Sequence, residues 1–202
     1  NNENRFDSTA QVEFKKIPCQ PIAYWVSERV REVFERESAV SSVAEPKQGL
    51  STCNNDLFLR SWSEVDDRNS CFDAADHEEA RSSGAMWFPY NKGGSFRRWY
   101  GNNDLVVNWL NNGQAIHAYN DVPIDYAGAP VRGKQFYFRA GMTWSSLASG
   151  SFGGRDTPPG FVFDAKGPVL FAKEEVDQEC LTGLFNSTVA EMFLRILAPT
   201  LD

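Results

Sequence analysis

The stretch GFVFDAKGPVLF, Gly160 to Phe171, is the part of the sequence that decides the expected fold. It places two apolar runs on either side of a short polar segment, Asp164 to Gly167. Apolar runs rich in Val and Phe and bounded by Gly, Pro and Asp are typical of strands, and two of them around a short turn predict a β-hairpin. We therefore expect β-structure in this region.

Similar patterns precede this stretch and extend the predicted β-structure through the middle of the chain. The runs LVVNW (105–109) and AIHAY (115–119) flank Asn111-Asn112-Gly113, a turn-forming sequence, and predict a second hairpin. The run QFYFRAGMTW (135–144) predicts a further strand. The middle of the chain is thus expected to hold mostly antiparallel strands.

Helical periodicity marks the two ends of the chain. Apolar residues recur three or four positions apart through IAYWVSERVREVFERES (22–38), with charges between them, which predicts an amphipathic helix. A second such pattern covers 181–196, with a break expected at Asn186-Ser187 and an end at Pro199. These patterns predict an α+β fold, in which helices from both termini flank mostly antiparallel strands.

Length and composition limit the organisation of the chain. A sequence of 202 residues that is 42% hydrophobic can bury one ordinary core, so a single domain spanning 1–202 is expected. No apolar run approaches the roughly 18 residues that cross a bilayer, which predicts a soluble, cytoplasmic chain without membrane contact. The chain begins at Asn1 and ends directly after an apolar run (196–201), and we expect it to be a fragment of a larger protein.

Charge is distributed unevenly along the sequence. The net charge is −7, but residues 86–172 hold 8 Lys and Arg against 5 Asp and Glu, whereas both flanking segments are acidic. A basic middle segment can present a local positive surface to phosphates, although the acidic whole is repelled from nucleic acid at long range. The acidic ends are equally typical of solvated faces.

Residues for a catalytic or metal site are not evident in the sequence. The four cysteines are far apart, and the two histidines have no obvious partners, so we predict no metal site and no catalytic residues. GAPVRGKQ (128–135) resembles a phosphate-binding loop but lacks its Ser or Thr and precedes a strand-like run. TPPG (157–160) resembles the amino-methyltransferase motif but lacks both its polar residue and its aromatic ring, and we interpret it as a turn.

The stretch WFPYNKGGSFRRWYGNND (87–104) concentrates aromatic and cationic side chains in an acidic chain. Arginine and lysine pair with phosphates or guanine edges, asparagine pairs with adenine edges, and Trp or Tyr stacks on unpaired bases. These residue types suit a nucleic-acid surface. They are equally compatible with core aromatics and with arginines paired to nearby carboxylates, and the sequence leaves both interpretations open.

Five long blocks, in order along nearly the whole chain, carry a resemblance to a known family. They are FKKIPCQPIAYWVSE (14–28), GLSTCNNDLFLRSWSEV (49–65), the stretch 87–104, GMTWSSLASGSFGGRDTPPGFVFDAKGPVLF (141–171) and LTGLFNSTVAEMFLRILAPTLD (181–202). Together they resemble the C-terminal, target-recognition-like part of PglX-type adenine-specific DNA methyltransferases of BREX phage-defence systems. Related pieces occur in target-recognition domains of restriction-modification enzymes.

The resemblance implies a division of labour within a larger enzyme. A separate N-terminal domain of the parent would bind S-adenosylmethionine and methylate adenine, while this chain would help to select the sequence in double-stranded DNA. The chain itself carries no catalytic or S-adenosylmethionine motif, so no cofactor is expected in it. Cys19 and Cys53 depart from the family pattern, which has glycine in these turns.

The candidate DNA-contacting residues follow from side-chain chemistry within the matching blocks and not from known contacts of the family. They are Lys92, Arg97, Arg98, Trp99, Tyr100, Asn102 and Asn103; Asn54, Asn55 and Arg60; and Trp144, Ser145, Ser146 and Arg155. A different class of function is also consistent with the aromatic content and the acidic ends. In that alternative the chain is a protein-interaction module, which docks the methyltransferase onto other subunits of a defence complex.

Overall fold

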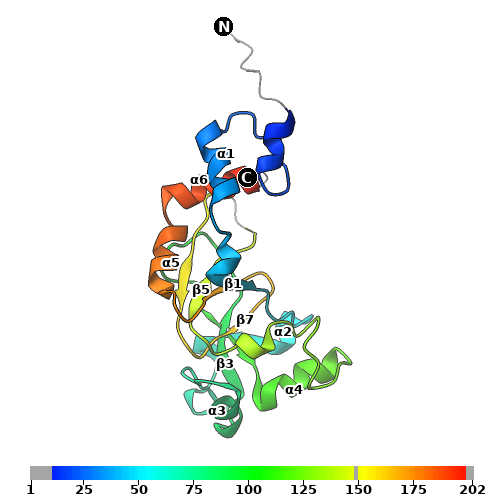
Figure 1. The fold of residues 1–202 in the computed structure, drawn as a ribbon. Helices are drawn as coiled ribbons and strands as arrows, with labels where there is room; N and C mark the ends of the chain where they lie inside the picture. Colours follow the sequence, from blue (N-terminus) through cyan, green and yellow to red (C-terminus); the bar gives the residue numbers. More distant parts are fainter. Residues whose placement is uncertain (1–10, 148–149, 199–202) are drawn as a thin grey trace.

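The computed structural model describes residues 11–147 and 150–198 as an α+β fold with helices near both ends (Figure 1). The strands are β1 (Ala44–Lys47), β2 (Leu59–Ser61), β3 (Trp87–Asn91), β4 (Leu105–Asn108), β5 (Gly141–Thr143), β6 (Arg155–Thr157), β7 (Val162–Phe163) and β8 (Val169–Ala172). The α-helices are α1 (Glu28–Arg36), α2 (Asn55–Phe58), α3 (His77–Ser82), α4 (Leu110–Tyr119), α5 (Gln178–Phe185) and α6 (Thr188–Leu197). Short 3₁₀ helices are η1 (Gln11–Lys16), η2 (Val40–Ser42), η3 (Trp62–Glu64), η4 (Asp67–Asn69) and η5 (Lys134–Phe136).

The strands form two four-stranded sheets. The first has the order β1-β8-β5-β6, with every neighbouring pair antiparallel. The second has the order β2-β4-β3-β7, in which only β3 and β7 run parallel. The prediction of mostly antiparallel strands in the middle of the chain is confirmed.

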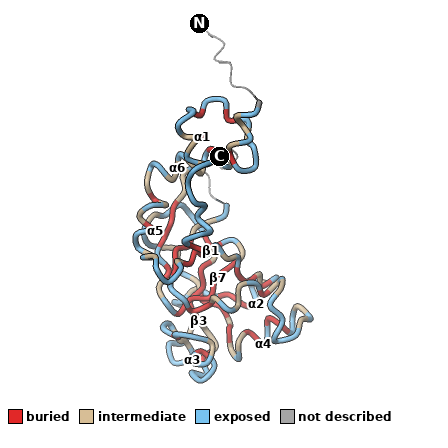
Figure 2. Tube along the Cα trace, viewed as in Figure 1, coloured by how far each residue is buried: buried red, intermediate tan, exposed pale blue. Residues whose placement is uncertain are grey.

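A largely aromatic core lies where the two sheets meet. Phe88, Tyr90 and Phe163 of the second sheet join Phe171 of the first, together with Trp109 and further apolar residues. The five aromatic residues named here are at most 3% exposed. Figure 2 shows the buried residues gathered around β1, β3 and β7. Because residues of both sheets share this core, the loops at the edges of the sheets are held by a rigid centre.

The terminal helices extend this core at one end of the molecule (Figure 1). A small cluster of Ile17, Ala23, Val26 and Ile196 joins the N-terminal segment to α6. The predicted break between the C-terminal helices is confirmed, because Asn186 ends α5 and the Ser187 hydroxyl caps α6 by accepting a bond from the Ala190 amide (3.2 Å). Pro199, expected to end the pattern, lies outside the described residues.

Within residues 11–147 and 150–198 no single helix combines the length and apolar character needed to cross a bilayer. The pair α5 and α6 reaches that threshold only when the two are taken together, across a bend of 68°.

Two hairpin predictions are wrong. The run AIHAY lies in α4 rather than in a strand, because Asn111, Asn112 and Gly113 all adopt positive φ (50°, 59° and 79°) and turn the chain into a helix after β4. GFVFDAKGPVLF does contain two strands, but they belong to different sheets: β7 pairs with β3 and β8 with β5 and β1. The strand predicted over 135–144 is reduced to β5, preceded by η5.

The amphipathic helix predicted over 22–38 is shorter than its pattern. The helix α1 begins at Glu28, after turns at Pro18 to Val26. One of those turns contains Cys19, whose φ of 62° is left-handed, and Cys53 has a φ of 61°. The two cysteines therefore keep the backbone conformation that favours the glycine expected in the family pattern.

Candidate nucleic-acid interface

The stretch 87–104 divides into a buried strand and an exposed loop. Its first residues form β3, in which Phe88 and Tyr90 are fully buried. Three aromatics of the loop are exposed instead: Phe96 by 50%, Trp99 by 56% and Tyr100 by 69%. The high aromatic content thus has two origins, and only the loop residues can stack on a ligand.

Backbone hydrogen bonds fix the loop against β6 of the first sheet. The Trp99 amide donates to the Gly154 carbonyl (2.8 Å), and the Asp156 amide donates to the Trp99 carbonyl (2.9 Å). Asn102 closes the loop on itself, because its side-chain amide donates to the Ser95 carbonyl (2.9 Å). The exposed rings therefore project from an anchored loop.

The cations of this stretch differ in how far their charge is compensated. Arg98 pairs with Glu191 of α6 (3.2 Å), and Lys92 is half-buried with its ammonium 3.9 Å from Asp164. Burial lowers the pKa of Lys92, while the Asp164 charge acts in the opposite direction. Arg97 is exposed and forms no ion pair within residues 11–147 and 150–198. Arg97 is thus the cation of the loop that is free to bind an anion.

A pocket of about 120 Å³ brings together candidates from two separate sequence blocks. Arg97 and Phe96 line it from the loop, and Trp144, Ser145 and Ser146 line it from the segment after β5. Arg155 of β6 and Phe152 complete its principal walls. We call this the arginine pocket. Its lining includes two arginines and, among the described residues, no carboxylate.

The two serines of the arginine pocket are engaged with backbone carbonyls. Ser145 donates to the Gly94 carbonyl (2.9 Å), and Ser146 donates to the Lys166 carbonyl (3.1 Å). They consequently fasten the segment after β5 to the loop and to the turn before β8. Phe96 and Phe152 are pocket residues that were not among the sequence candidates, although Phe96 lies within the quoted aromatic-basic stretch.

The block around α2 does not reach the arginine pocket. Asn54 caps α2 by accepting a bond from the Leu57 amide (3.2 Å), and Asn55 accepts one from the Thr52 hydroxyl (2.8 Å). Arg60 donates to the Asp56 carbonyl (2.7 Å) and lies over the Trp87 ring (5.8 Å). These contacts stabilise the local turn. Asn103 lines a different, apolar pocket beside Trp62 and Phe72.

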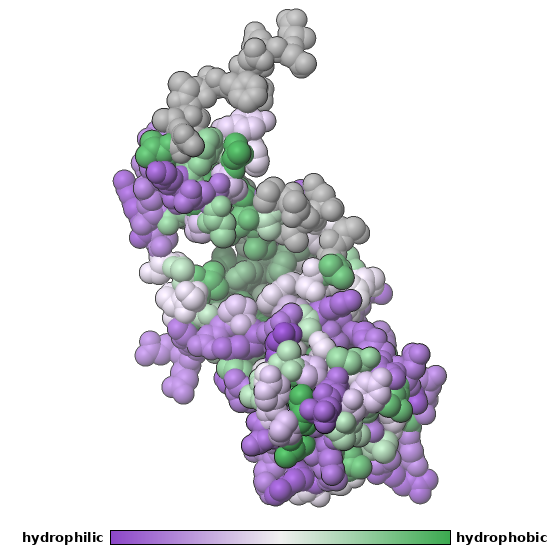
Figure 3. All heavy atoms as spheres, turned by 90° about the vertical axis from the view of Figure 1, so that its right-hand side faces the viewer, coloured by the Kyte–Doolittle hydropathy of each residue, from purple (hydrophilic) through white to green (hydrophobic). Residues whose placement is uncertain are grey.

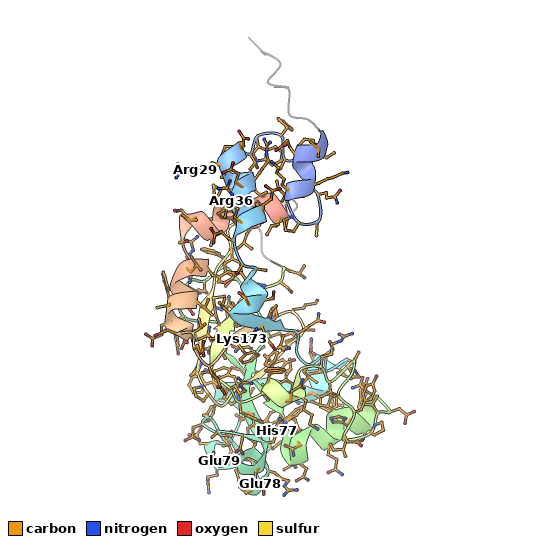
Figure 4. The ribbon with its side chains drawn as sticks, viewed as in Figure 1. Arg29, Arg36, His77, Glu78, Glu79 and Lys173 are labelled. Atoms are coloured by element: carbon orange, nitrogen blue, oxygen red, sulfur yellow. The ribbon has the colours of Figure 1, made fainter. Side chains whose placement is uncertain are left out.

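The two histidines also have structural surroundings. His77 points from α3 toward α4 (Figure 4), where its ring contacts the Asn112 side chain (3.2 Å) and the Lys134 carbonyl (2.7 Å). The Lys134 ammonium donates to the Ile124 carbonyl (2.8 Å) and lies 3.4 Å from His117 Nε2. Over the described ranges, no group of three or more His, Cys, Asp or Glu residues is placed to hold a metal ion.

His117 makes the stability of the fold dependent on pH. It is 2% exposed, and burial followed by the Lys134 charge lowers its pKa from the ordinary value of 6.5. The unfolded chain therefore binds this proton more tightly, and stability decreases as the pH falls below 6.5 toward the lowered pKa. We expect His117→Gln to show a smaller drop in melting temperature between pH 7.5 and pH 5 than the wild type, as measured by thermal denaturation. Equal drops in the two proteins would contradict this.

Comparison with known proteins extends the sequence resemblance. Adenine-specific methyltransferase PglX of Lacticaseibacillus casei (strain Zhang) is 39% identical over 202 residues, which cover 100% of this chain and 17% of that protein. Adenine-specific methyltransferase BrxX of Escherichia coli O9:H4 (strain HS) is 33% identical over 205 residues, covering 100% of this chain and 16% of that protein. No protein-family model matches the chain.

These matches confirm the resemblance to PglX-type methyltransferases over the whole chain. The chain spans about a sixth of the length of the curated relatives that it matches, which is consistent with a region of a larger enzyme.

Proposed function

We propose that this chain, which along its whole length resembles part of the PglX-type adenine-specific methyltransferases, is the DNA-recognition part of such an enzyme. It would act as a single domain that grips duplex DNA, while a separate domain binds S-adenosylmethionine and methylates adenine at N6. The physical need is clear, because an adenine must leave the base stack before its N6 reaches the methyl donor. A second surface must then hold the duplex and set its register.

The convergence at the arginine pocket is the observation that supports this proposal. Residues far apart in the sequence, Arg97, Trp144 and Arg155, meet at one pocket without a carboxylate in its described lining. The exposed rings of Trp99 and Tyr100 belong to the same anchored loop as Arg97. Arginines position the phosphate backbone, and exposed aromatic rings contact bases. Such a surface offers both kinds of contact that nucleic acid makes, whereas an acidic protein surface would use only the arginines.

Arg97, Trp99 and Tyr100 are the strongest candidates for DNA contacts, because their side chains are exposed and Arg97 forms no ion pair within the described residues. Lys92 and Arg98 already neutralise the carboxylates Asp164 and Glu191, so a DNA phosphate would have to compete for their charge. Asn102 and Asn103 belong to the same loop and are the candidates for base edges.

Arg97→Ala is expected to weaken the binding of duplex DNA about 10- to 100-fold, since a charge-assisted hydrogen bond contributes about 1.5–3 kcal/mol. It should also reduce the slope of log affinity against log salt by about 1, the contribution of one phosphate contact. Fluorescence anisotropy at several salt concentrations, with the full chain and with the methyltransferase that carries it, measures both quantities.

Arg132→Ala is the matched control, because Arg132 is an exposed arginine that does not line the arginine pocket. Its affinity and salt slope should stay at the wild-type values. If Arg97→Ala is folded and binds DNA with the wild-type affinity and slope, the loop does not contact the backbone and the proposed function loses its support.

A separate observation favours the alternative of a protein-docking module. Between the N-terminal segment and α6 lies an apolar groove of about 370 Å³, lined by Trp25, Val26, Val30, Met192 and Ile196. Figure 3 shows hydrophobic side chains exposed in the hollow below the N-terminal helices. Apolar docking depends little on salt, whereas DNA binding weakens steeply as salt rises, so the same titration separates the two functions.

A further inference from the structure

Arg155 is a buried cation without a buried counter-charge. It is 1% exposed, yet no carboxylate lies within ion-pair distance of its guanidinium in the part of the chain that the structure describes. Its Nε has no hydrogen-bond partner, and its Nη1 makes only a long bond to the Ser145 hydroxyl (3.4 Å). Burial lowers the pKa of Arg155, which reflects how unfavourable the charged form is in this position.

The fold does not need this side chain to hold its strand in place. Backbone bonds to Trp99 and the pairing with β5 already fix β6. The neighbouring Gly154 is held from both sides by the Asn186 side chain, through an accepted and a donated bond of 2.9 Å each. A buried, unpaired charge is costly, and structural cations are normally paired with an acid. A guanidinium left unsatisfied at the wall of a pocket therefore indicates a ligand that supplies the negative charge.

The dimensions and lining of the arginine pocket define the class of this ligand. A volume of about 120 Å³ admits a group the size of a phosphate, and Arg97 faces the same space as Arg155. The rings of Phe96, Trp144 and Phe152 give it apolar walls, and a charge-assisted hydrogen bond is stronger beside apolar groups than in bulk water. A guanidinium binds tetrahedral oxyanions through two parallel hydrogen bonds. Three serines also line the pocket: the hydroxyls of Ser145 and Ser146 donate to backbone carbonyls, and the Ser151 hydroxyl bonds to the Glu191 carboxylate outside the lining.

We propose that the arginine pocket is a binding site for a single phosphate group, which Arg155 holds from within and Arg97 holds from the loop. This assignment rests on the proposed DNA-binding function, since the phosphate would be one of the DNA backbone. It adds that one phosphate is bound in a pocket with aromatic walls and a buried arginine, unlike the exposed phosphate contacts of an ordinary basic surface. The affinity of this site depends on the planar fork of arginine and not on charge alone.

The decisive variant is Arg155→Lys, which keeps the charge but loses the fork. In the full chain, we expect it to remain folded by circular dichroism and to bind duplex DNA at least tenfold more weakly than the wild type. Ser145→Ala, which removes the long bond to Nη1 and the bond to the Gly94 carbonyl, is the second variant in case Arg155→Lys does not fold; it should weaken DNA binding several-fold. Arg132→Ala again serves as the control with unchanged affinity.

Nuclear magnetic resonance of the arginine Nε–H groups provides a direct readout with inorganic phosphate as the probe. The Arg155 Nε–H signal of the wild type, which has no partner in the free chain, should shift on addition of phosphate, and the shift should be weaker in Arg97→Ala. A signal that does not respond to either phosphate or duplex DNA would overturn the proposal.

The two experiments separate the phosphate site from the DNA-binding function. If the wild type binds DNA and folded Arg155→Lys binds it equally well, DNA recognition stands and the phosphate site is refuted. If phosphate shifts the Arg155 signal but the chain and the whole enzyme do not bind DNA, the phosphate site stands for a free phosphate and the DNA-recognition function is refuted.

Discussion

Asp164→Ala is expected to lower the free energy of unfolding by about 3–5 kcal/mol, the usual cost of removing one partner from a buried charged network. Asp164 is 6% exposed and directly follows β7. Its carboxylate accepts bonds from the Tyr90 hydroxyl (2.7 Å) and the Lys166 amide (2.7 Å), and it lies 3.9 Å from the Lys92 ammonium. Alanine would leave the buried Tyr90 hydroxyl with only a long bond to the Leu50 carbonyl (3.4 Å) and the half-buried Lys92 ammonium without its counter-charge.

The effect is large because Asp164 joins both sheets. Through Tyr90 it binds β3 of the second sheet, and through the turn at Lys166 it positions the start of β8 in the first. Burial, followed by the charge of Asp164, raises the pKa of Tyr90 well above its ordinary value, so the phenol remains a hydrogen-bond donor throughout the accessible pH range. The melting temperature should fall by about 6–20 °C, since 1 kcal/mol corresponds to about 2–4 °C in a chain of this size.

Differential scanning calorimetry measures this change. Asp156→Asn is the matched control: Asp156 is exposed and forms no ion pair within the described residues, so loss of its charge should alter stability by no more than about 0.5 kcal/mol. Tyr90→Phe combined with Asp164→Ala should cost less than the sum of the two single changes. A loss below about 1 kcal/mol for Asp164→Ala would show that the network does not hold the sheets together.

Gly49→Ala should have a comparable effect for a steric reason. A Cβ at Gly49 would lie 2.0 Å from the Phe163 carbonyl oxygen and 2.5 Å from its ring. The adjacent Leu50 amide donates to that same carbonyl (2.8 Å), so the two backbones cannot separate without breaking the bond. Overpacking of a core costs about 1–3 kcal/mol, and loss of the hydrogen bond adds about 1 kcal/mol.

Gly183→Ala provides a control with the opposite sign. Gly183 lies within α5, and a Cβ there would meet no atom within 4 Å. Alanine in a helix interior is favoured over glycine by about 0.5–1 kcal/mol, so this variant should be more stable than the wild type. Urea titration of both variants tests the pair, and a Gly49→Ala chain as stable as the wild type would contradict the close backbone approach.

The sequence predicted the elements of this fold better than their pairing. Periodicity located the C-terminal helices because α5 and α6 are amphipathic over their whole length, whereas α1 begins six residues after the pattern does. The strand pairs failed because sheet partners are decided by tertiary packing: β7 lies parallel to β3, far away in the sequence. Asn111, Asn112 and Gly113 all have left-handed backbone conformations and are followed by a helix. The same Asn-Asn-Gly sequence is typical of a hairpin turn, so the sequence alone could not separate the two outcomes.

The sequence predicted some of the residues that line the arginine pocket, but not which candidates would meet there, because that also depends on tertiary packing. Residue chemistry selected Arg97, Trp144 and Arg155, which the structure brings together, but it also selected Asn54 and Asn55, whose side chains cap and brace α2. The side-chain amide of asparagine can cap a helix or pair with the edge of a base. Only the surroundings of the residue in the fold decide between these two roles. Burial of Arg155 without an acid could not be read from the sequence, because it depends on which side chains the fold places around it.

The residues at and after the break between α5 and α6 bind the segments that carry the pocket arginines. Asn186, at the break, forms two hydrogen bonds with Gly154, the residue before Arg155 and β6, and Glu191, one turn into α6, pairs with Arg98 beside Arg97. Hydrogen bonds from Ser151 and Arg195, together with the nearby arginine charges, lower the pKa of Glu191, so this ion pair persists in mildly acidic solution. A displacement of α6 would therefore shift the residues next to both Arg97 and Arg155 at once. The position of the terminal helices and the geometry of the arginine pocket are thus coupled.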